Sequence, residues 1–277
     1  MAAINAAMVK SLRERSGLPM MDCKQALMET NGDENAALEL LRKRGAMAAE
    51  KKAGRTTAEG RIGSYRDKQT GKAAIVEMLC ETAPVANNPD FRQFIDQLAK
   101  HVALTGEGKL ETLGSEKFID NPETTITELL NDMINRIREN MKISRVAKVI
   151  GRAATYVHHT GKVGVIIGVE GDGGDDALLN DICMHIAALQ PESLRREDLP
   201  ADLVKKEEEI AREQIRASGK PENMIDKILT GKMSRWYSEH VLLEQPFVKD
   251  DKKTVGKILE QAGIKLTGYT RLQVGEV

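Results

Sequence analysis

Histidines are the residues of this sequence best suited to acid–base chemistry or metal binding, and it has five. His158 and His159 are adjacent on an expected strand, so their side chains should point to opposite faces and could not readily share a metal ion. His101 and His185 occupy expected helices among apolar neighbours, where a satisfied core or interface histidine is the usual situation. An enzyme using them would need a pocket that brings one of them near a carboxylate. The pattern favours no catalytic residue and no metal site.

Glycine and cysteine patterns give equally little support for chemistry. Residues 168–176, GVEGDGGDD, are rich in glycine, but they lack the Lys and Ser/Thr of a phosphate loop, and their three aspartates would repel phosphate. We expect a surface turn there. Cys23, Cys80 and Cys183 match neither a disulfide framework nor a zinc spacing, which is typical of buried thiols in a reducing compartment.

Charge and hydropathy exclude further classes of function. The 277 residues contain 41 Lys plus Arg and 42 Asp plus Glu, and this balance provides no global field for a polyanion. No apolar run reaches the about 20 residues that cross a bilayer, and the N-terminal segment does not have the pattern of a targeting leader. We expect a cytoplasmic chain of more than one unit, with no cofactor and no direct contact with nucleic acid or membrane.

The pattern of residues 1–54 predicts three short helices. Gly17–Pro19 should end the first helix, while Asp22 and Asp33 are expected to cap the second and third. The small and polar residues 46–60 are expected to form a linker.

Two apolar features suit binding of a partner. Met20 and Met21 lie at the junction of the first two helices, where they could either fill the three-helix core or meet a partner helix. Residues 82–88, TAPVANN, join an expected strand to an expected helix and could be an inert connection or an intruding wedge. Composition alone leaves both pairs of alternatives open.

The rest of the chain predicts an α+β core with an internal repeat. Residues 62–65 and 73–80 are expected to pair as an antiparallel hairpin followed by a helix that Asn88 caps. The same strand-strand-helix pattern recurs from Tyr156, and His185 then takes the position that His101 has in the first copy. The repeat predicts two related antiparallel-sheet-plus-helix subdomains, at 55–140 and 141–277.

Heptad spacing predicts an antiparallel coiled-coil hairpin at about 198–238, inserted in the second subdomain. Its first helix should present Leu203, Ile210 and Ala217, with Val204 and Ala211 beside them. A break at 218–221 should precede the second helix. The second stripe comprises Ile225, Leu229, Met233 and Trp236. A last helix, capped by Thr254, and a closing strand complete the expected fold.

At several of these positions the chain resembles the elongation factor Ts family over nearly its whole length. The similar residues, in the family's order and spacing, are Val9, Leu12, Arg13, Ser16, Gly17, 20–27, 184–188, Pro191, 244–248 and 253–255. The resemblance implies a ubiquitin-associated-like three-helix module, a core of two related subdomains and a coiled-coil insertion. It also implies a guanine-nucleotide exchange factor for the GTPase elongation factor Tu, which performs no covalent chemistry.

The resemblance assigns partner contacts residue by residue. It implies that Arg13, Met20 and Met21 pack against the GTPase domain of elongation factor Tu, and that the region of His158 touches a β-barrel domain. It further implies a loop that enters near the magnesium and phosphate site, formed here by Thr82, Ala83, Pro84 and Val85. A dimer of the complex with elongation factor Tu is also compatible with it.

Two departures from the family concern this loop and the last strand. The family usually has Thr-Asp-Phe-Val where this chain has Thr-Ala-Pro-Val, which removes a carboxylate and an aromatic wedge. We also expect the helical extension of some members after the last strand to be absent. The alternative function is an adaptor of ubiquitin-associated type that binds a partner without changing nucleotide release.

Overall fold

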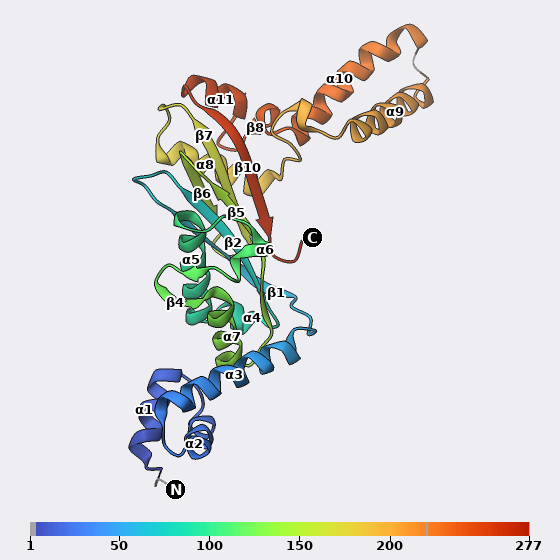
Figure 1. Cartoon of the computed structure of the whole chain (residues 1–277). Helices are drawn as coiled ribbons and strands as arrows, with labels where there is room; N and C mark the ends of the chain where they lie inside the picture. The colour runs from blue at the N-terminus through green and yellow to red at the C-terminus, as the bar shows by residue number, and fades with distance from the viewer. Residues whose placement is uncertain (1–3, 220, 277) are drawn as a thin grey trace.

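A computed structural model describes residues 4–219 and 221–276 as an elongated body of helices and antiparallel sheet. A helical module lies at one end, and a helical hairpin projects from the other (Figure 1). The hairpin break predicted at 218–221 includes Lys220, which lies outside the described residues. Mixed helix and antiparallel sheet confirm the α+β class.

The N-terminal module consists of α1 (Ala6–Ser16), α2 (Met20–Glu29) and α3 (Glu34–Lys52), as predicted. Gly17 ends α1 in the left-handed conformation, and the Asp33 carboxylate caps α3. The cap predicted at Asp22 is wrong, because α2 already begins at Met20 after Pro19. Asp22 lies in the first turn of α2, where its carboxylate pairs with Arg138 instead.

Helix α3 joins the module to the body. It continues through Lys52, so the predicted linker at 46–60 is reduced to the few residues before β1. Ala49 explains the extension, because it is 7% exposed and packs in the first sheet's core. Gly45 lets α3 approach α7 closely, since a Cβ there would lie 3.3 Å from Cβ of Asn135.

The first sheet has the order β1-β2-β5, with antiparallel pairing throughout. Helices α5 and α7 pack on one face through the first core. The remaining helices and strands of this half fill the connections. In chain order the elements are β1 (Glu59–Arg66), β2 (Ala73–Cys80), α4 (Ala83–Ala86), α5 (Pro89–Leu104), α6 (Leu110–Leu113), β3 (Lys117–Phe118), β4 (Asn121–Thr125), α7 (Ile126–Ile137) and β5 (Met141–Val149).

The second sheet repeats this plan in the order β6-β7-β10. Helices α8 and α11 cover its outer face. A helical hairpin interrupts the connection after α8. The elements are β6 (Ala153–Val157), β7 (Val163–Glu170), α8 (Asp176–Leu189), η1 (Arg196–Asp198), α9 (Ala201–Ala217), α10 (Glu222–His240), η2 (Leu242–Glu244), β8 (Pro246–Phe247), β9 (Asp250–Thr254), α11 (Val255–Gln261) and β10 (Lys265–Gln273).

Strand β5 bears on the boundary between the two predicted subdomains. It forms the third strand of the first sheet by pairing with β2, so a boundary at 140 would separate two hydrogen-bonded strands. We therefore infer a division between β5 and β6, near residue 150.

The two sheets pack against each other through a small apolar layer. Ile62 of β1 faces Gly164 of β7, and a Cβ on Gly164 would lie 2.5 Å from Cγ2 of Ile62. On the other face of β1, a Cβ on Gly63 would lie 2.4 Å from Cγ2 of Ile95 in α5. Because side chains alternate along a strand, Ile62 and Gly63 lie on opposite faces of β1, so that β1 contacts β7 on one face and α5 on the other. The layer between the sheets comprises Ile62, Ala73, Ile75, Ala153, Ile166 and Leu272.

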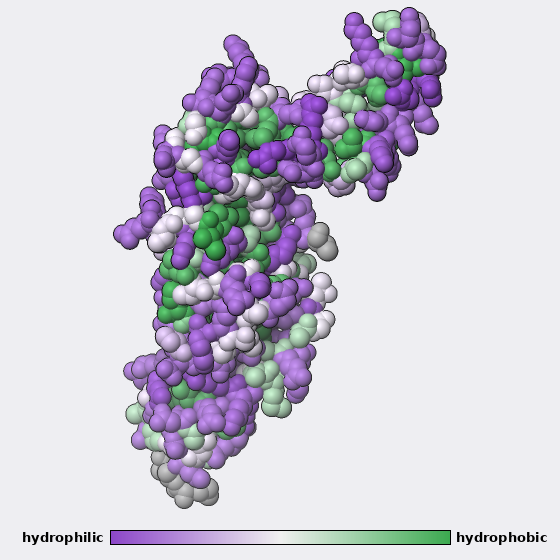
Figure 2. Space-filling view, turned by 45° about the horizontal axis from the view of Figure 1, so that its top comes forward, coloured by the Kyte–Doolittle hydropathy of each residue, from purple (hydrophilic) through white to green (hydrophobic). Residues whose placement is uncertain are grey.

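The projecting hairpin is formed by α9 and α10, which pack together as predicted. Figure 2 shows hydrophobic surface along it between hydrophilic side chains. The stripe expected on α9 is confirmed only in part, because Ile210 is 37% exposed and Ala217 is exposed. Ala211, which was expected beside the stripe, and Ile215 are buried against α10, with Val204 partly buried next to them. The stripe expected on α10 is confirmed by Ile225, Leu229 and Met233, with Trp236 partly buried beside them.

Candidate partner-binding surface

The methionines at the start of α2 point away from the core of the module. Met20 is 53% exposed and Met21 is 69% exposed, and Arg13 on α1 is exposed as well. The alternative that both methionines fill the three-helix core is therefore wrong. Leu12, Cys23 and other residues occupy that core. The module thus exposes flexible apolar side chains on α2 and a cation on α1, a composition suited to protein contact.

The segment expected as a loop at 82–88 contains one helical turn, α4. Thr82, Ala83 and Pro84 are exposed, whereas Val85 is 9% exposed and packs in the first core. Val85 therefore anchors the turn. Pro84 has a fixed φ, so the exposed corner is stiffer than a free loop.

Thr82 is held by Glu139, which lies between α7 and β5. The Glu139 carboxylate accepts the Thr82 backbone N–H at 3.0 Å and its hydroxyl at 2.6 Å. Sequence reasoning missed this partner, because Glu139 lies 57 positions away from Thr82 and carries no local motif.

His158 lies in the turn that joins β6 to β7. The expectation that His158 and His159 point to opposite faces is wrong, because β6 ends at Val157 and the two rings lie 4.1 Å apart. His158 Nδ1 is 2.9 Å from the hydroxyl of Thr160. A cavity of about 500 Å³ adjoins His158, and its wall includes Val248, which is 52% exposed. This surface combines apolar and polar groups, as a protein interface does.

The two buried histidines make matching contacts. His101 Nδ1 accepts the backbone N–H of Ile119 at 3.1 Å, and its Nε2 lies 2.8 Å from the Glu116 carboxylate. His185 Nδ1 accepts the backbone N–H of Val248 at 3.2 Å, and its Nε2 lies 2.9 Å from Oε1 of Gln245. In each case Nδ1 accepts a backbone hydrogen, so Nε2 carries the proton that is donated.

These contacts bear on the enzyme alternative. His101 does approach a carboxylate, but it is 1% exposed and its ring nitrogens are engaged in fixing the β3–β4 hairpin. His185 is fully buried, and burial lowers its pKa below the ordinary value, against the opposing effect of the hydrogen bond to Gln245. Each ring lies next to a phenylalanine ring, Phe118 for His101 and Phe247 for His185, with 5.8 Å between the ring centroids. Their environment is that of structural histidines.

The glycine-rich stretch 168–176 is arranged around a cation. Arg152 donates hydrogen bonds to the carbonyl oxygens of Gly171, Gly173 and Gly174 at 2.5, 2.7 and 2.6 Å. A phosphate cradle needs backbone N–H groups directed at the anion, whereas here the carbonyls converge on a guanidinium. The interpretation as a turn is therefore favoured.

The cysteines are buried thiols, as expected. Burial raises the pKa of Cys80 and of Cys183 to about 12. Because the thiolate is the nucleophilic form, these two thiols are inert near neutral pH. Among the residues that the structure describes, no three His, Cys, Asp or Glu side chains converge as a metal site would require.

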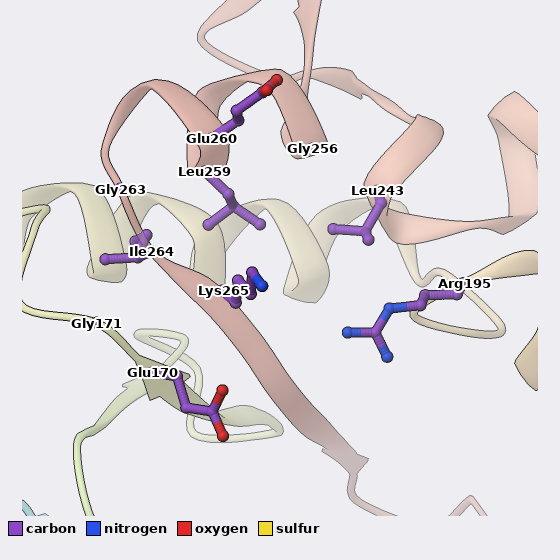
Figure 3. A pocket seen from close by; sticks show the side chains of 10 residues that line it. All are labelled: Glu170, Gly171, Arg195, Leu243, Gly256, Leu259, Glu260, Gly263, Ile264 and Lys265. Carbon is purple, nitrogen blue, oxygen red and sulfur yellow. The ribbon is translucent and has the colours of Figure 1, made fainter.

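A larger cavity of about 750 Å³ lies beside α11 and the start of β10 (Figure 3). Leu243, Leu259 and Ile264 line it with apolar surface that continues the second core. Its rim carries Glu170 opposite Lys265, which are paired across β7 and β10. Opposite charges on one rim give no electrostatic preference for an anion or a cation.

Within residues 4–219 and 221–276, no helix combines the length and hydropathy that crossing a membrane requires.

The family model described as elongation factor TS matches residues 81–276. The chain belongs to the elongation factor Ts family. It is thus a member of a family of translation elongation factors, as the signatures around Met20, His185 and Gln245 predicted.

Curated relatives extend the match to the N-terminal module. Elongation factor Ts of Halothermothrix orenii is 39% identical over 272 residues, which cover 97% of this chain and 91% of that protein. Elongation factor Ts of Hydrogenovibrio crunogenus is 43% identical over 276 residues, covering 99% of this chain and 92% of that protein. The corresponding protein of Methylococcus capsulatus is 42% identical over 277 residues, covering 99% and 93%. This elongation factor Ts family member is therefore matched along nearly its full length.

Proposed function

We propose that this chain is a guanine-nucleotide exchange factor that binds elongation factor Tu with GDP and promotes GDP release during translation elongation. The observation that carries the proposal is the exposed, stiff corner Ala83–Pro84, held on a buried anchor in a chain of the elongation factor Ts family. The exchange factor forms no covalent bond and needs no cofactor. It works in the cytoplasm, where elongation takes place.

The free energy for release comes from differential binding. If the factor lowers the affinity of its partner for GDP, linkage requires that GDP lowers the affinity of the partner for the factor by the same ratio. The Mg²⁺ ion and the phosphate-binding loops supply much of the electrostatic attraction for the nucleotide. A wedge that displaces those loops therefore weakens GDP binding most efficiently.

The corner at α4 suits this role by its shape. Pro84 and Ala83 take the place of the family's aromatic and acidic pair, so the proposed action is steric. Val85, which lies in the core, acts as the anchor of the corner and does not itself contact the partner. Thr82 begins the corner and fixes its direction through Glu139.

Two further surfaces would provide affinity. Arg13, Met20 and Met21 would pack against the GTPase domain, with the methionines adapting to an apolar partner helix. The surface around His158 and Val248 would contact a second, β-barrel domain. The projecting hairpin would allow two such complexes to associate.

Stopped-flow release of fluorescent GDP from elongation factor Tu of the same organism tests the proposal. The wild-type chain should accelerate GDP release. The double variant Ala83→Gly, Pro84→Gly should accelerate it less than the wild type does, because glycine removes the stiffness of the corner. Glu123→Gln, an exposed carboxylate on β4, serves as the control and should release GDP at the wild-type rate.

The outcomes separate the candidate functions. If the wild-type chain binds elongation factor Tu without changing GDP release, the adaptor alternative is correct and exchange is excluded. If the wild type accelerates release and the glycine variant is equally fast, the activity lies in the other contacts.

A further inference from the structure

The turn that follows α7, residues Arg138–Asn140, contacts three separate segments of the chain. Arg138 ends α7 in the left-handed conformation with φ of 73°, and its N–H bonds the carbonyl of Ile134. This conformation reverses the chain at once, so consecutive side chains are directed toward different neighbours. We call residues 138–140 the hub turn.

Glu139 holds the exposed corner at α4. Both of its carboxylate oxygens accept hydrogen bonds from Thr82, one from the backbone N–H and one from the hydroxyl. Hydrogen bonds to a charged acceptor are stronger than neutral ones, and two of them fix orientation as well as distance. Thr82 is the residue before Ala83 and Pro84, so Glu139 sets the direction in which that corner projects.

Arg138 holds the helix that carries the methionines. Its guanidinium pairs with the carboxylate of Asp22 in the first turn of α2, directly after Met20 and Met21. This pair is half-exposed and crosses from the body to the N-terminal module. It therefore contributes to the angle at which α2 presents its apolar side chains.

Asn140 fixes the hub turn to the segment between α3 and β1. It is 5% exposed, and its side-chain amide donates to the carbonyl oxygens of Ala53 and Arg55 at 3.3 and 2.9 Å. Its backbone N–H bonds the Glu81 carboxylate at 2.6 Å, immediately before Thr82. The hub turn thus has a buried base from which the two charged side chains extend.

We infer that Arg138 and Glu139 are positioning residues for nucleotide exchange. Glu139 fixes the corner that acts on the nucleotide site, and Arg138 fixes the module that binds the partner. The inference rests on the proposed exchange function. It accounts for how a corner without the usual carboxylate and aromatic ring keeps a defined direction.

The two residues should affect different kinetic parameters. With Glu139→Gln, which replaces one acceptor oxygen by a donor, the maximal rate of GDP release at saturating factor should fall by about tenfold, with little change in the half-saturating concentration. With Arg138→Gln, the half-saturating concentration should rise by about threefold at an unchanged maximal rate, as loss of an exposed ion pair implies. GDP release from elongation factor Tu, measured against factor concentration, gives both numbers.

A mutant cycle and a matched control complete the experiment. Thr82→Val keeps the backbone N–H and removes the hydroxyl, so combining it with Glu139→Gln should slow release no further than the slower single variant. Glu123→Gln should change neither parameter. If Glu139→Gln fails to fold by circular dichroism, the maximal rate of Thr82→Val decides the question.

The results also distinguish this inference from the function beneath it. A wild-type chain that does not accelerate GDP release overturns both. If the wild type is active and Glu139→Gln and Thr82→Val keep its maximal rate, the exchange function stands and the positioning role is wrong. Equal losses for Arg138→Gln and Glu139→Gln in both parameters would also overturn it, because a general structural defect would not separate them.

Discussion

Single buried side chains fix the positions of short segments in this chain. The two buried histidines each hold a small hairpin by accepting a backbone N–H, from Ile119 in one half and from Val248 in the other. Repetition in the sequence predicted that His101 and His185 occupy equivalent positions in the two subdomains. The hydrogen-bond partners were not predictable, because Gln245 lies 60 positions from His185, beyond the inserted hairpin.

Protonation of His185 should make stability depend on pH. Its pKa is lowered from 6.5 in the fold, chiefly by burial, so below 6.5 the unfolded chain binds a proton that the folded chain does not. The stabilisation is complete above about pH 6.5 and is lost as the pH falls from there through the folded-state pKa. Urea unfolding at pH 7.5 and 5.5 should show a smaller loss for His185→Gln than for the wild type.

His159→Gln is the control for this measurement, because His159 is exposed in the β6–β7 turn. It should lose as much stability as the wild type between the two pH values. An equal loss in His185→Gln would show that other groups carry the pH dependence.

At the scale of helices and strands, the closeness of packing depends on where glycine occurs. Gly164 brings β7 against Ile62, whereas Gly231 in α10 has open space where its Cβ would be. The same substitution should therefore have opposite effects at the two positions.

Gly164→Ala should lower the free energy of unfolding by about 1–3 kcal/mol, because the new methyl group overlaps Ile62. Gly231→Ala should raise it by about 0.5–1 kcal/mol through higher helix propensity. Urea unfolding of both variants checks the pair. Destabilisation by Gly231→Ala, or none by Gly164→Ala, would contradict the packing described.

The elements were largely predictable, and the errors have physical causes. Periodicity located the three N-terminal helices and the hairpin of β1 and β2, whereas the predicted caps were right at Asp33 and wrong at Asp22. On α9 the centre of the stripe was placed one position too early, because Leu203–Ile210 and Val204–Ala211 follow overlapping heptad patterns and only the position of α10 selects between them. Helix α3 was predicted too short because Ala49 is buried by the core of the first sheet, whose residues lie far along the chain from α3.

At the scale of the whole molecule, the partly exposed Arg145 and the buried Glu77 form an ion pair that connects the two sheets. Glu77 on β2 is 1% exposed, and both of its oxygens bond Arg145 of β5. Arg145 also donates to the carbonyl of Gln273, at the end of β10, at 2.5 Å. One guanidinium thus links the first sheet to the last strand of the second, a contact across 128 positions that no local pattern indicates.

Replacing one partner of this ion pair should lower the free energy of unfolding more than replacing both partners. Glu77→Leu leaves Arg145 without its carboxylate and should destabilise the fold by about 3 kcal/mol, while Glu77→Leu combined with Arg145→Met should recover part of that loss. Denaturant unfolding of the single and double variants measures both. A double variant less stable than the single would show that the contact of Arg145 with Gln273 outweighs the charge pairing.

The inserted hairpin has a counterpart position in the first half of the chain. The connection from α8 to β8 carries α9 and α10, whereas the equivalent connection from α5 to β3 spans only residues 105–116 and is exposed at Lys109 and Leu110. The fold thus repeats one subdomain plan twice, and only the second copy carries an insertion in this connection. The equivalent connection at 105–116 is therefore a suitable place to insert a reporter domain or a second helical hairpin.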